Sequence, residues 1–241
     1  LQNISKKKVK IVGILYGMSE MISELKYAPI VNLKKALEVN NWISGAYSFS
    51  EFGNAQKICE LLENIDKSAS CVLIDFTDAN NLNNMVALQN SVQRLKGINL
   101  DNLPAIAKMT VTPVVKDFIQ KIGNPNSTSE FQFNLAVWHR DRKQYYAAYL
   151  TLVEAIVSYV CEKCFLNETS REDRDTAKKN INSKNSSYFQ DHPEFYILNE
   201  AYLKLNSIRR RLAHSLPLDR SNESLIRTLN ESISSLRSIW R

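Results

Sequence analysis

The sequence is poor in the residues that build disulfide frameworks, metal sites and phosphate-binding loops. Four cysteines in 241 residues are too few to staple a fold, so we expect a reducing compartment, the cytoplasm. No apolar run approaches the roughly 18 to 20 residues of a membrane-spanning helix, and we expect no membrane partner. Gly-rich phosphate loops, HExxH, GxSxG and carboxylate clusters at metal-binding spacing are missing. These absences exclude the P-loop NTPases, the HExxH metalloproteases and the GxSxG serine hydrolases.

Glycine and proline are scarce in the second half of the chain. All six glycines lie at or before Gly123, and beyond Pro125 only Pro193 and Pro217 interrupt the sequence. Because both residues break helices, their scarcity predicts a C-terminal half that is entirely helical. The composition otherwise suits a folded domain, with 44% hydrophobic residues and a net charge of +6 from 31 basic and 25 acidic residues. That modest excess fits an anionic partner without requiring one.

The first apolar segment has the pattern of a strand. Residues Val9 to Tyr16 follow a basic run, are rich in aliphatic side chains and stop at Gly17, so we predict one buried strand. A single strand leaves its backbone groups unpaired, and the helical remainder offers few strands to pair with. We therefore expect its partner strands to lie upstream of Leu1.

Beyond Pro29 the apolar residues follow a helical period that begins with Ile30 and Leu33. The segment "CVLIDF" at 71–76 fits either a short strand or the start of a buried helix. Residues 167–187 are polar and nearly free of aromatic side chains, which predicts a surface excursion or a poorly ordered loop. Between the glycine and proline breaks we predict helices over residues 55–65, 78–95, 112–122, 130–139 and 144–165.

Two groups of reactive side chains have simple structural explanations. Cys161 and Cys164 form a CxxC in the apolar stretch "AIVSYVCEKCF", but a zinc site needs two further ligands, so we favour buried or half-buried helical cysteines without metal. The segment "VWHRDRKQYY" places His139 among charges and aromatics, as on a nucleic-acid surface, but a turn between two helices is the favoured interpretation. His192 precedes Pro193 at an expected helix start and is given no role.

The segment "SIRRRLAHS" at 207–215 is the strongest candidate for a site. An upstream apolar stripe places Arg210, Arg211 and His214 largely on other faces of the helix. Arg210 and His214 are four residues apart and share a face, whereas Arg209 and His214 are five apart, about 140° around an ideal helix. The alternative is a solvated basic helix end, in which the cations simply favour the helix dipole before Pro217 stops the helix.

The segment "IRRRLAH", preceded by the helix "EFYILNEAYLKL", resembles the signature of HEPN ribonucleases, in which an arginine and a histidine close a helix. The resemblance covers essentially the whole chain, with residues 167–187 least constrained. In order, "VGILYG", "APIVNL", "NNWISGAYSFSEFGNAQKICELL" and "VWHRDRKQYYAAYLTLVEAIVSYVCEK" are similar to the region that follows the ligand-binding CARF domain in CRISPR-associated CARF and HEPN proteins of type III systems.

This resemblance implies a mainly α fold: the last strand of a Rossmann-like CARF domain over residues 1–20, a helical connector over 21–125 and a HEPN helical bundle over 126–241. It implies a metal-independent endoribonuclease of an antiviral CRISPR response, which cleaves single-stranded RNA through the ribose 2′-hydroxyl. The implied activator is cyclic oligoadenylate bound to the CARF part, and no cofactor is expected. Two chains would compose one cleft, so we expect a homodimer. The alternative is a catalytically weak HEPN module for dimerisation or RNA binding.

By its match to the motif, the catalytic pair is expected to be Arg209 and His214. Histidine suits proton transfer because its ordinary pKa is about 6.5, and arginine suits charge developing on phosphate. The resemblance assigns Glu154 a supporting role on the facing helix, with a simple ion pair as the alternative. Arg210 and Arg211 are expected to hold flanking RNA phosphates. The family usually has a small polar residue where this chain has Arg210, so Arg209 and Arg210 both stay open as the catalytic arginine.

Overall fold

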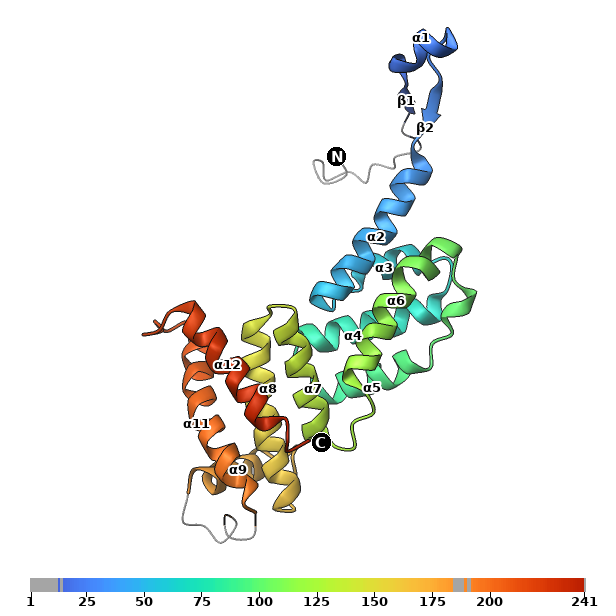
Figure 1. The fold of residues 1–241 in the computed structure, drawn as a ribbon. Coiled ribbons are helices and arrows are strands. Elements are labelled where there is room, and N and C mark those ends of the chain that lie inside the picture. Colours follow the sequence, from blue (N-terminus) through green and yellow to red (C-terminus); the bar gives the residue numbers. More distant parts are fainter. Residues whose placement is uncertain (1–12, 14, 184–188, 190–191, 241) are drawn as a thin grey trace. The chain divides into compact units, whose positions relative to one another are not determined.

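Helices make up nearly all of the chain that the structure describes. The computed structural model describes residues 13, 15–183, 189 and 192–240, and this part contains eleven α-helices, two 3₁₀ helices and one two-stranded sheet (Figure 1). The prediction of a mainly α fold with a short strand near the N-terminus is confirmed. None of the described helices combines the length and the apolar character needed to span a lipid bilayer. The chain divides into two compact units, Leu1–Lys116 and Asp117–Arg241, and the three-part domain division stays a prediction.

A small antiparallel sheet lies near the N-terminus. Its two strands pair with Tyr16 opposite Val31, and the backbone N–H of Met18 donates to the carbonyl of Pro29 at 3.0 Å. This hydrogen bond extends the hairpin by one step beyond the paired strands. The elements of the region are β1 (Leu15–Gly17), η1 (Ser19–Met21), α1 (Ile22–Leu25) and β2 (Ile30–Asn32).

Two predictions for this region are wrong where the structure describes it. The strand is not buried, because Leu15 is 69% exposed. Its described part pairs with β2 of this chain, and partner strands upstream of Leu1 stay a prediction. Ile30 belongs to that strand and not to a helical stripe, because its neighbour Pro29 is held in the hairpin. The earlier part of the predicted strand lies outside the described residues, and its origin in a CARF domain stays a prediction.

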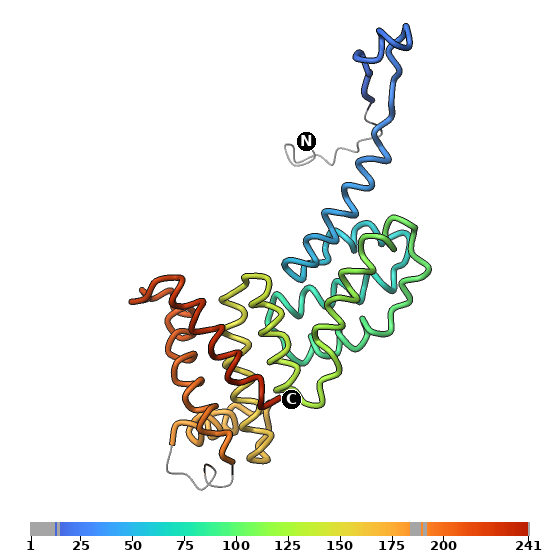
Figure 2. The backbone as a smooth tube through the Cα atoms, viewed as in Figure 1, coloured from blue at the N-terminus to red at the C-terminus, as the bar shows by residue number. Residues whose placement is uncertain are grey.

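The first unit continues as a series of helices, each from α2 to α5 packing on the next (Figure 2). The buried rings of Phe49 and Phe76 lie 5.6 Å apart and join α2 to α4. Its helices are α2 (Lys34–Phe52), α3 (Gln56–Leu62), α4 (Lys67–Asn81), α5 (Met85–Lys96) and η2 (Leu100–Asn102), and α6 (Ala105–Ile122) begins in this unit and ends in the second.

The structure corrects two helix boundaries in this unit and resolves one alternative. The segment 71–76 lies inside α4 and is helical. The single helix predicted over 78–95 is two helices, because Asn83 adopts a left-handed φ of 50° and the Asn84 side chain caps α5 by accepting from the N–H of Ala87. Helix α6 starts directly after Pro104, whose carbonyl accepts from the N–H of Lys108, rather than at residue 112.

The second unit is a helical bundle around α8. Leu152, Ile156 and Val160 are fully buried along α8. Helices α7, α9, α11 and α12 all contact α8, and α7 and α8 form a hairpin of helices (Figures 1 and 2). The prediction of an entirely helical C-terminal half is confirmed for the residues described. Its helices are α7 (Thr128–Asp141), α8 (Tyr145–Lys163), α9 (Arg171–Asn182), α11 (Glu194–Ala213) and α12 (Asn222–Leu236).

Most of the segment predicted as a polar loop is a helix. Helix α9 begins after Ser170, whose side chain accepts from the N–H of Asp173. Although its composition is polar, the helix has a narrow apolar face: Ala177 and Ile181 are four residues apart, so they lie on the same side, and both are fully buried. Two apolar residues at helical spacing are enough to attach this helix to the bundle. Residues 184–188 lie outside the described part.

Candidate active site

The end of α11 presents the "SIRRRLAHS" segment as the sequence predicts, with its apolar side inward. Ile208 is buried, whereas Arg210 and His214 are exposed. His214 caps the C-terminal end of the helix, directly after Ala213, and its backbone N–H donates to the carbonyl of Arg210 at 3.2 Å. The following Ser215 takes a left-handed φ of 51°, and the N–H of Leu216 closes the turn on the carbonyl of Arg211 at 2.9 Å. These hydrogen bonds fix the backbone that carries His214.

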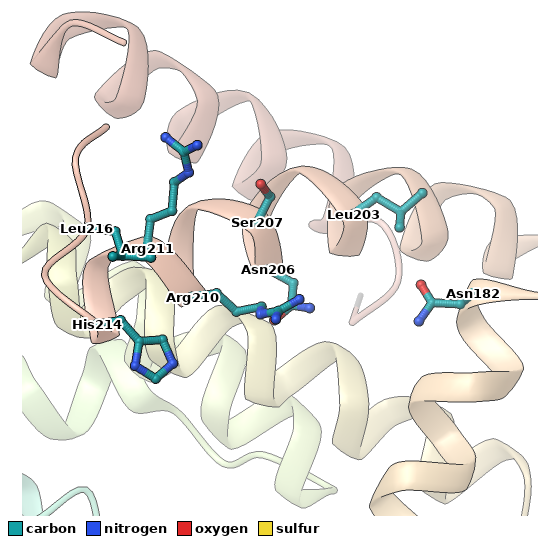
Figure 3. Close-up of a pocket in the computed structure, with 8 residues that line it drawn as sticks. All are labelled: Asn182, Leu203, Asn206, Ser207, Arg210, Arg211, His214 and Leu216. Carbon is teal, nitrogen blue, oxygen red and sulfur yellow. The ribbon is translucent and has the colours of Figure 1, made fainter. Parts of the chain in front are cut away.

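A groove of about 490 Å³ opens beside this helix end (Figure 3). The side chains of Arg210 and His214 reach it from one side of α11, whereas Arg211 extends away from His214. No salt bridge joins Arg210 or His214 to another residue of the described chain. Both groups are therefore free to meet an anion. The polar lining consists of Asn182, Asn206, Ser207, Arg210, Arg211 and His214.

Arg209 lies on another side of α11 and does not line the groove. Its Nη2 donates to Oε1 of Glu154 on α8 at 3.2 Å. Its Nε is buried and has no hydrogen-bond partner among the described residues. The predicted catalytic arginine and histidine are thus separated: Glu154 holds Arg209, and His214 shares the groove with Arg210.

Glu154 also accepts from Arg174 on α9, so one carboxylate lies between two guanidinium groups. Arg174 donates further to Oγ of Ser158 at 3.3 Å and to the carbonyl of Glu168 at 3.1 Å. The side chains of Glu154 and Arg174 are only 23% and 19% exposed. The ion-pair interpretation of Glu154 is confirmed, and its supporting role in an active site stays a prediction.

Sequence reasoning did not find Arg174, because the segment around it was predicted to be a loop. The available signal was the pair Ala177 and Ile181, whose spacing of four marks a helix that attaches to the bundle. A helix in that place brings Arg174 to α8. Asn182, from the end of the same helix, was missed for the same reason.

The guanidinium of Arg211 forms hydrogen bonds with the loop that follows α11. Its Nη1 donates to the carbonyl of Pro217 at 2.7 Å and to Oδ2 of Asp219 at 2.6 Å. Both partners of this ion pair are well exposed, at 41% and 78%, so the pair adds little stability and an RNA phosphate can compete for the guanidinium. Its expected role in holding phosphate stays a prediction.

The CxxC cysteines are buried or half-buried, as the sequence predicts. Cys161 is fully buried in α8, and burial raises the pKa of its thiol to about 11. Cys164 follows the helix and its pKa is also raised by burial. Thiols with raised pKa values carry little thiolate at neutral pH, and so they are poor nucleophiles and poor metal ligands. Whether the chain holds a metal stays a prediction.

The other two histidines lie outside the groove. His139 is 5% exposed in the last turn of α7, where its Nδ1 lies 2.8 Å from Oε1 of Gln144 in the connection to α8. Burial lowers its pKa to about 4, and the helix-turn interpretation is confirmed over the nucleic-acid surface. His192 stacks on Phe195 and lies 3.3 Å from Oε1 of Glu194, next to the start of α11.

Comparison with known proteins indicates a CRISPR-associated class. Residues 38–129, from α2 to the start of α7, match the family described as the second domain of CRISPR-associated protein MJ1674. The chain is also 32% identical over 212 residues to CRISPR-associated protein MJ1674 of Methanocaldococcus jannaschii. That similarity covers 87% of this chain and 33% of the relative, so the chain spans about a third of the length of the relative. The similarity to a CRISPR-associated protein is confirmed, and the CARF and HEPN assignments stay predictions.

Proposed function

We propose that this chain is the HEPN ribonuclease region of a CRISPR-associated protein of a type III system, and that it cleaves single-stranded RNA without a metal. The observation that carries the proposal is the groove at the end of α11, where Arg210 and His214 are both exposed and free of salt bridges with described residues. The similarity to a CRISPR-associated protein supports the same biological context.

The groove supplies the groups that such a cleavage needs. A base removes the proton of the ribose 2′-hydroxyl, the 2′-oxygen bonds to phosphorus and the bond to the 5′-oxygen breaks. An acid then protonates that leaving oxygen. The products are a 2′,3′-cyclic phosphate and a 5′-hydroxyl. One exposed imidazole, His214, serves as the proton-transfer group of each chain, and a homodimer would bring two of them to one cleft.

Two arginines compete for the electrostatic role. Arg210 already faces the groove and reaches a phosphate without losing an internal ion pair. Arg209 matches the family motif, and its second donor edge, Nε, has no hydrogen-bond partner among the described residues. A guanidinium holds a phosphate with two donors. To bind the substrate phosphate, Arg209 would therefore need to turn away from Glu154, or to donate to Glu154 and to the phosphate at the same time. In this proposal the contribution of Arg209 to cleavage depends on the strength of its ion pair with Glu154.

The activator proposed for the whole protein is cyclic oligoadenylate, bound by a CARF part rather than by the residues described here. The second candidate is a catalytically weak HEPN module that dimerises or binds RNA. The observation that favours it is the Glu154 ion pair, which holds Arg209 outside the groove in a single chain.

The test is cleavage of a fluorogenic single-stranded RNA in excess EDTA, with and without cyclic oligoadenylates. We expect cleavage products that end in a 2′,3′-cyclic phosphate, detected by mass spectrometry. Binding of RNA without cleavage in every condition would favour the weak module. Cleavage that requires a divalent metal, or products that end in a 3′-hydroxyl, would contradict the proposed chemistry.

A further inference from the structure

We infer that single-stranded RNA runs from the candidate active site along a groove between α11 and α12, where Arg220 and Arg227 bind its phosphates. This inference rests on the proposed function. It assigns binding roles to two arginines that lie outside the HEPN motif.

The groove consists of three adjoining hollows, because neighbouring hollows share lining residues. The hollow at His214 shares Leu203, Ser207 and Arg211 with a second one of about 420 Å³. The second shares Lys204 and Arg220 with a third of about 660 Å³. Together they follow α11 from His214 back to Ile197, a length of about 25 Å at 1.5 Å per residue.

Positive charge is present along the whole groove. Arg210 lies at the His214 end, Arg220 in the middle and Arg227 at the far end. None of these three guanidinium groups forms a salt bridge with another residue of the described part of the chain. Lys204 and Arg211 also line the groove, but they are paired with Glu200 and Asp219. The unpaired cations are therefore spread along the groove rather than concentrated at its catalytic end.

The carboxylates in the groove leave a net positive lining. The acidic lining residues are Glu200, Asp219 and Glu231, against five arginine and lysine side chains. Each of the first two neutralises one cation. Three cations then face a single unpaired carboxylate, so the lining has a net positive charge and attracts a polyanion such as RNA.

The rest of the lining suits a flexible strand read by its backbone. Hydroxyl groups of Ser207 and Ser224 line the groove and are typical donors to phosphate oxygens. No tyrosine, phenylalanine or tryptophan lines any of the three hollows, so the usual platforms for base stacking are missing. With the 3.4 Å phosphate spacing of a stacked strand, about seven phosphates fit along 25 Å, and fewer fit if the strand is extended. The groove should therefore add affinity for longer RNAs with little base preference.

The test compares the binding of a long and a short RNA. Full-length chain is titrated with fluorescent 2′-O-methyl RNAs of about four and about twelve nucleotides, which cannot be cleaved through the 2′-hydroxyl and which bracket the site sizes usual for single strands. The variants are Arg220→Gln, Arg227→Gln and their combination. Arg237→Gln is the matched control, because Arg237 is exposed at the end of α12 and lines none of the three hollows.

We expect the double variant to bind the longer RNA about tenfold more weakly, with the salt dependence of log K reduced by roughly 0.7 per lost phosphate contact. Binding of the shorter RNA by the double variant, and binding of both RNAs by Arg237→Gln, should stay within about twofold of the wild-type chain. Equal loss for both lengths, an unchanged salt slope, or altered self-association with unchanged RNA binding would each overturn the inference. Absence of RNA binding in the wild-type chain would instead refute the proposed function itself.

Discussion

Arg209 and Glu154 form an ion pair between α11 and α8, with Nη2 of the arginine 3.2 Å from Oε1 of the carboxylate. The next arginine along the chain, Arg210, shares the groove with His214 instead. Consecutive helical residues point about 100° apart, so one arginine faces the bundle and the other faces the solvent. The local signature thus supplies two arginines with different surroundings, and their roles can be separated by substitution.

Substitution of His214 should remove RNA cleavage while leaving the fold intact. The side chain is exposed and contributes little packing, but it is the proposed proton-transfer group, so His214→Ala should reduce the cleavage rate on the order of 10²-fold or more. His192→Ala is the control, because that histidine lies outside the groove. Activity that survives in folded His214→Ala, after a mock purification excludes contaminating nucleases, would return the segment to a solvated basic helix end.

The two arginines should differ in what they change. Arg209→Ala should reduce the cleavage rate about as severely as loss of the histidine, through lost charge stabilisation in the transition state. Arg210→Ala should act mainly on RNA affinity and its salt dependence. Single-turnover rates at saturating RNA separate the two effects. The reverse pattern would assign the catalytic role to Arg210, which shares a helix face and the groove with His214.

Glu154→Gln should destabilise the protein by about 2 kcal/mol, because both Arg174 and Arg209 lose their charged partner in a largely buried place. Urea unfolding measures this change. The exposed ion pair of Glu200 with Lys204 is the control, and Glu200→Gln should change stability by less than about 0.5 kcal/mol. Equal effects of both substitutions on the free energy of unfolding would show that the ion pairs of Glu154 with Arg174 and Arg209 do not stabilise the fold.

Stability should fall between pH 6.5 and about 4 because of His139. The pKa of its buried imidazole is lowered from 6.5 to about 4, so in this window the unfolded chain binds a proton that the folded chain does not. The contribution is complete above pH 6.5 and is lost as the pH falls, by about 3 kcal/mol in total. His139→Gln should flatten this part of the curve. Equal slopes for both proteins would contradict the buried neutral state.

The chain should form a homodimer. The described part of α11 exposes apolar side chains that the bundle does not cover, of which Tyr196 lies outside the RNA groove, whereas Ile197 and Leu203 also line it, so the contact between chains and the groove adjoin on this helix. The α12 stripe of Leu225, Leu229, Ile233 and Leu236 is buried in the bundle instead, which leaves α11 as the expected contact. Light scattering at micromolar concentration should give twice the 27.6 kDa mass of one chain. A monomer in all conditions would contradict a cleft shared by two chains.

The cysteines should be dispensable for activity. Cys161→Ala and Cys164→Ser should leave RNA cleavage within a few fold, because both thiols have raised pKa values and neither lines the groove. The buried Cys161 also packs in the bundle, so its replacement should lower stability by about 1 kcal/mol. Stoichiometric zinc in the purified protein would overturn this expectation.

The sequence alone determined which segments are helices wherever apolar periodicity is strong. It correctly predicts α7, α8 and α11 because hydrophobic side chains recur at helical spacing over many turns. It also determined that Arg210 and His214 share a face, since four residues make nearly one helical turn. Weakly periodic segments were predicted less well: residues 167–187 contain a helix whose apolar face consists of only two buried residues, and Ile30 took the extended backbone of a hairpin.

Only the tertiary structure decided how these groups are paired. The ion pairs of Glu154 join residues that lie 20 and 55 positions apart in the sequence, and no local pattern encodes such a distance. Packing of α8 against both α9 and α11 brings Arg174 and Arg209 to one carboxylate. The same packing leaves Arg210 as the arginine that lines the groove with His214, and the packing of α12 on α11 places Arg220 and Arg227 beside α11. Burial and charge compensation between distant helices, rather than the motif itself, therefore distinguish one arginine from the next.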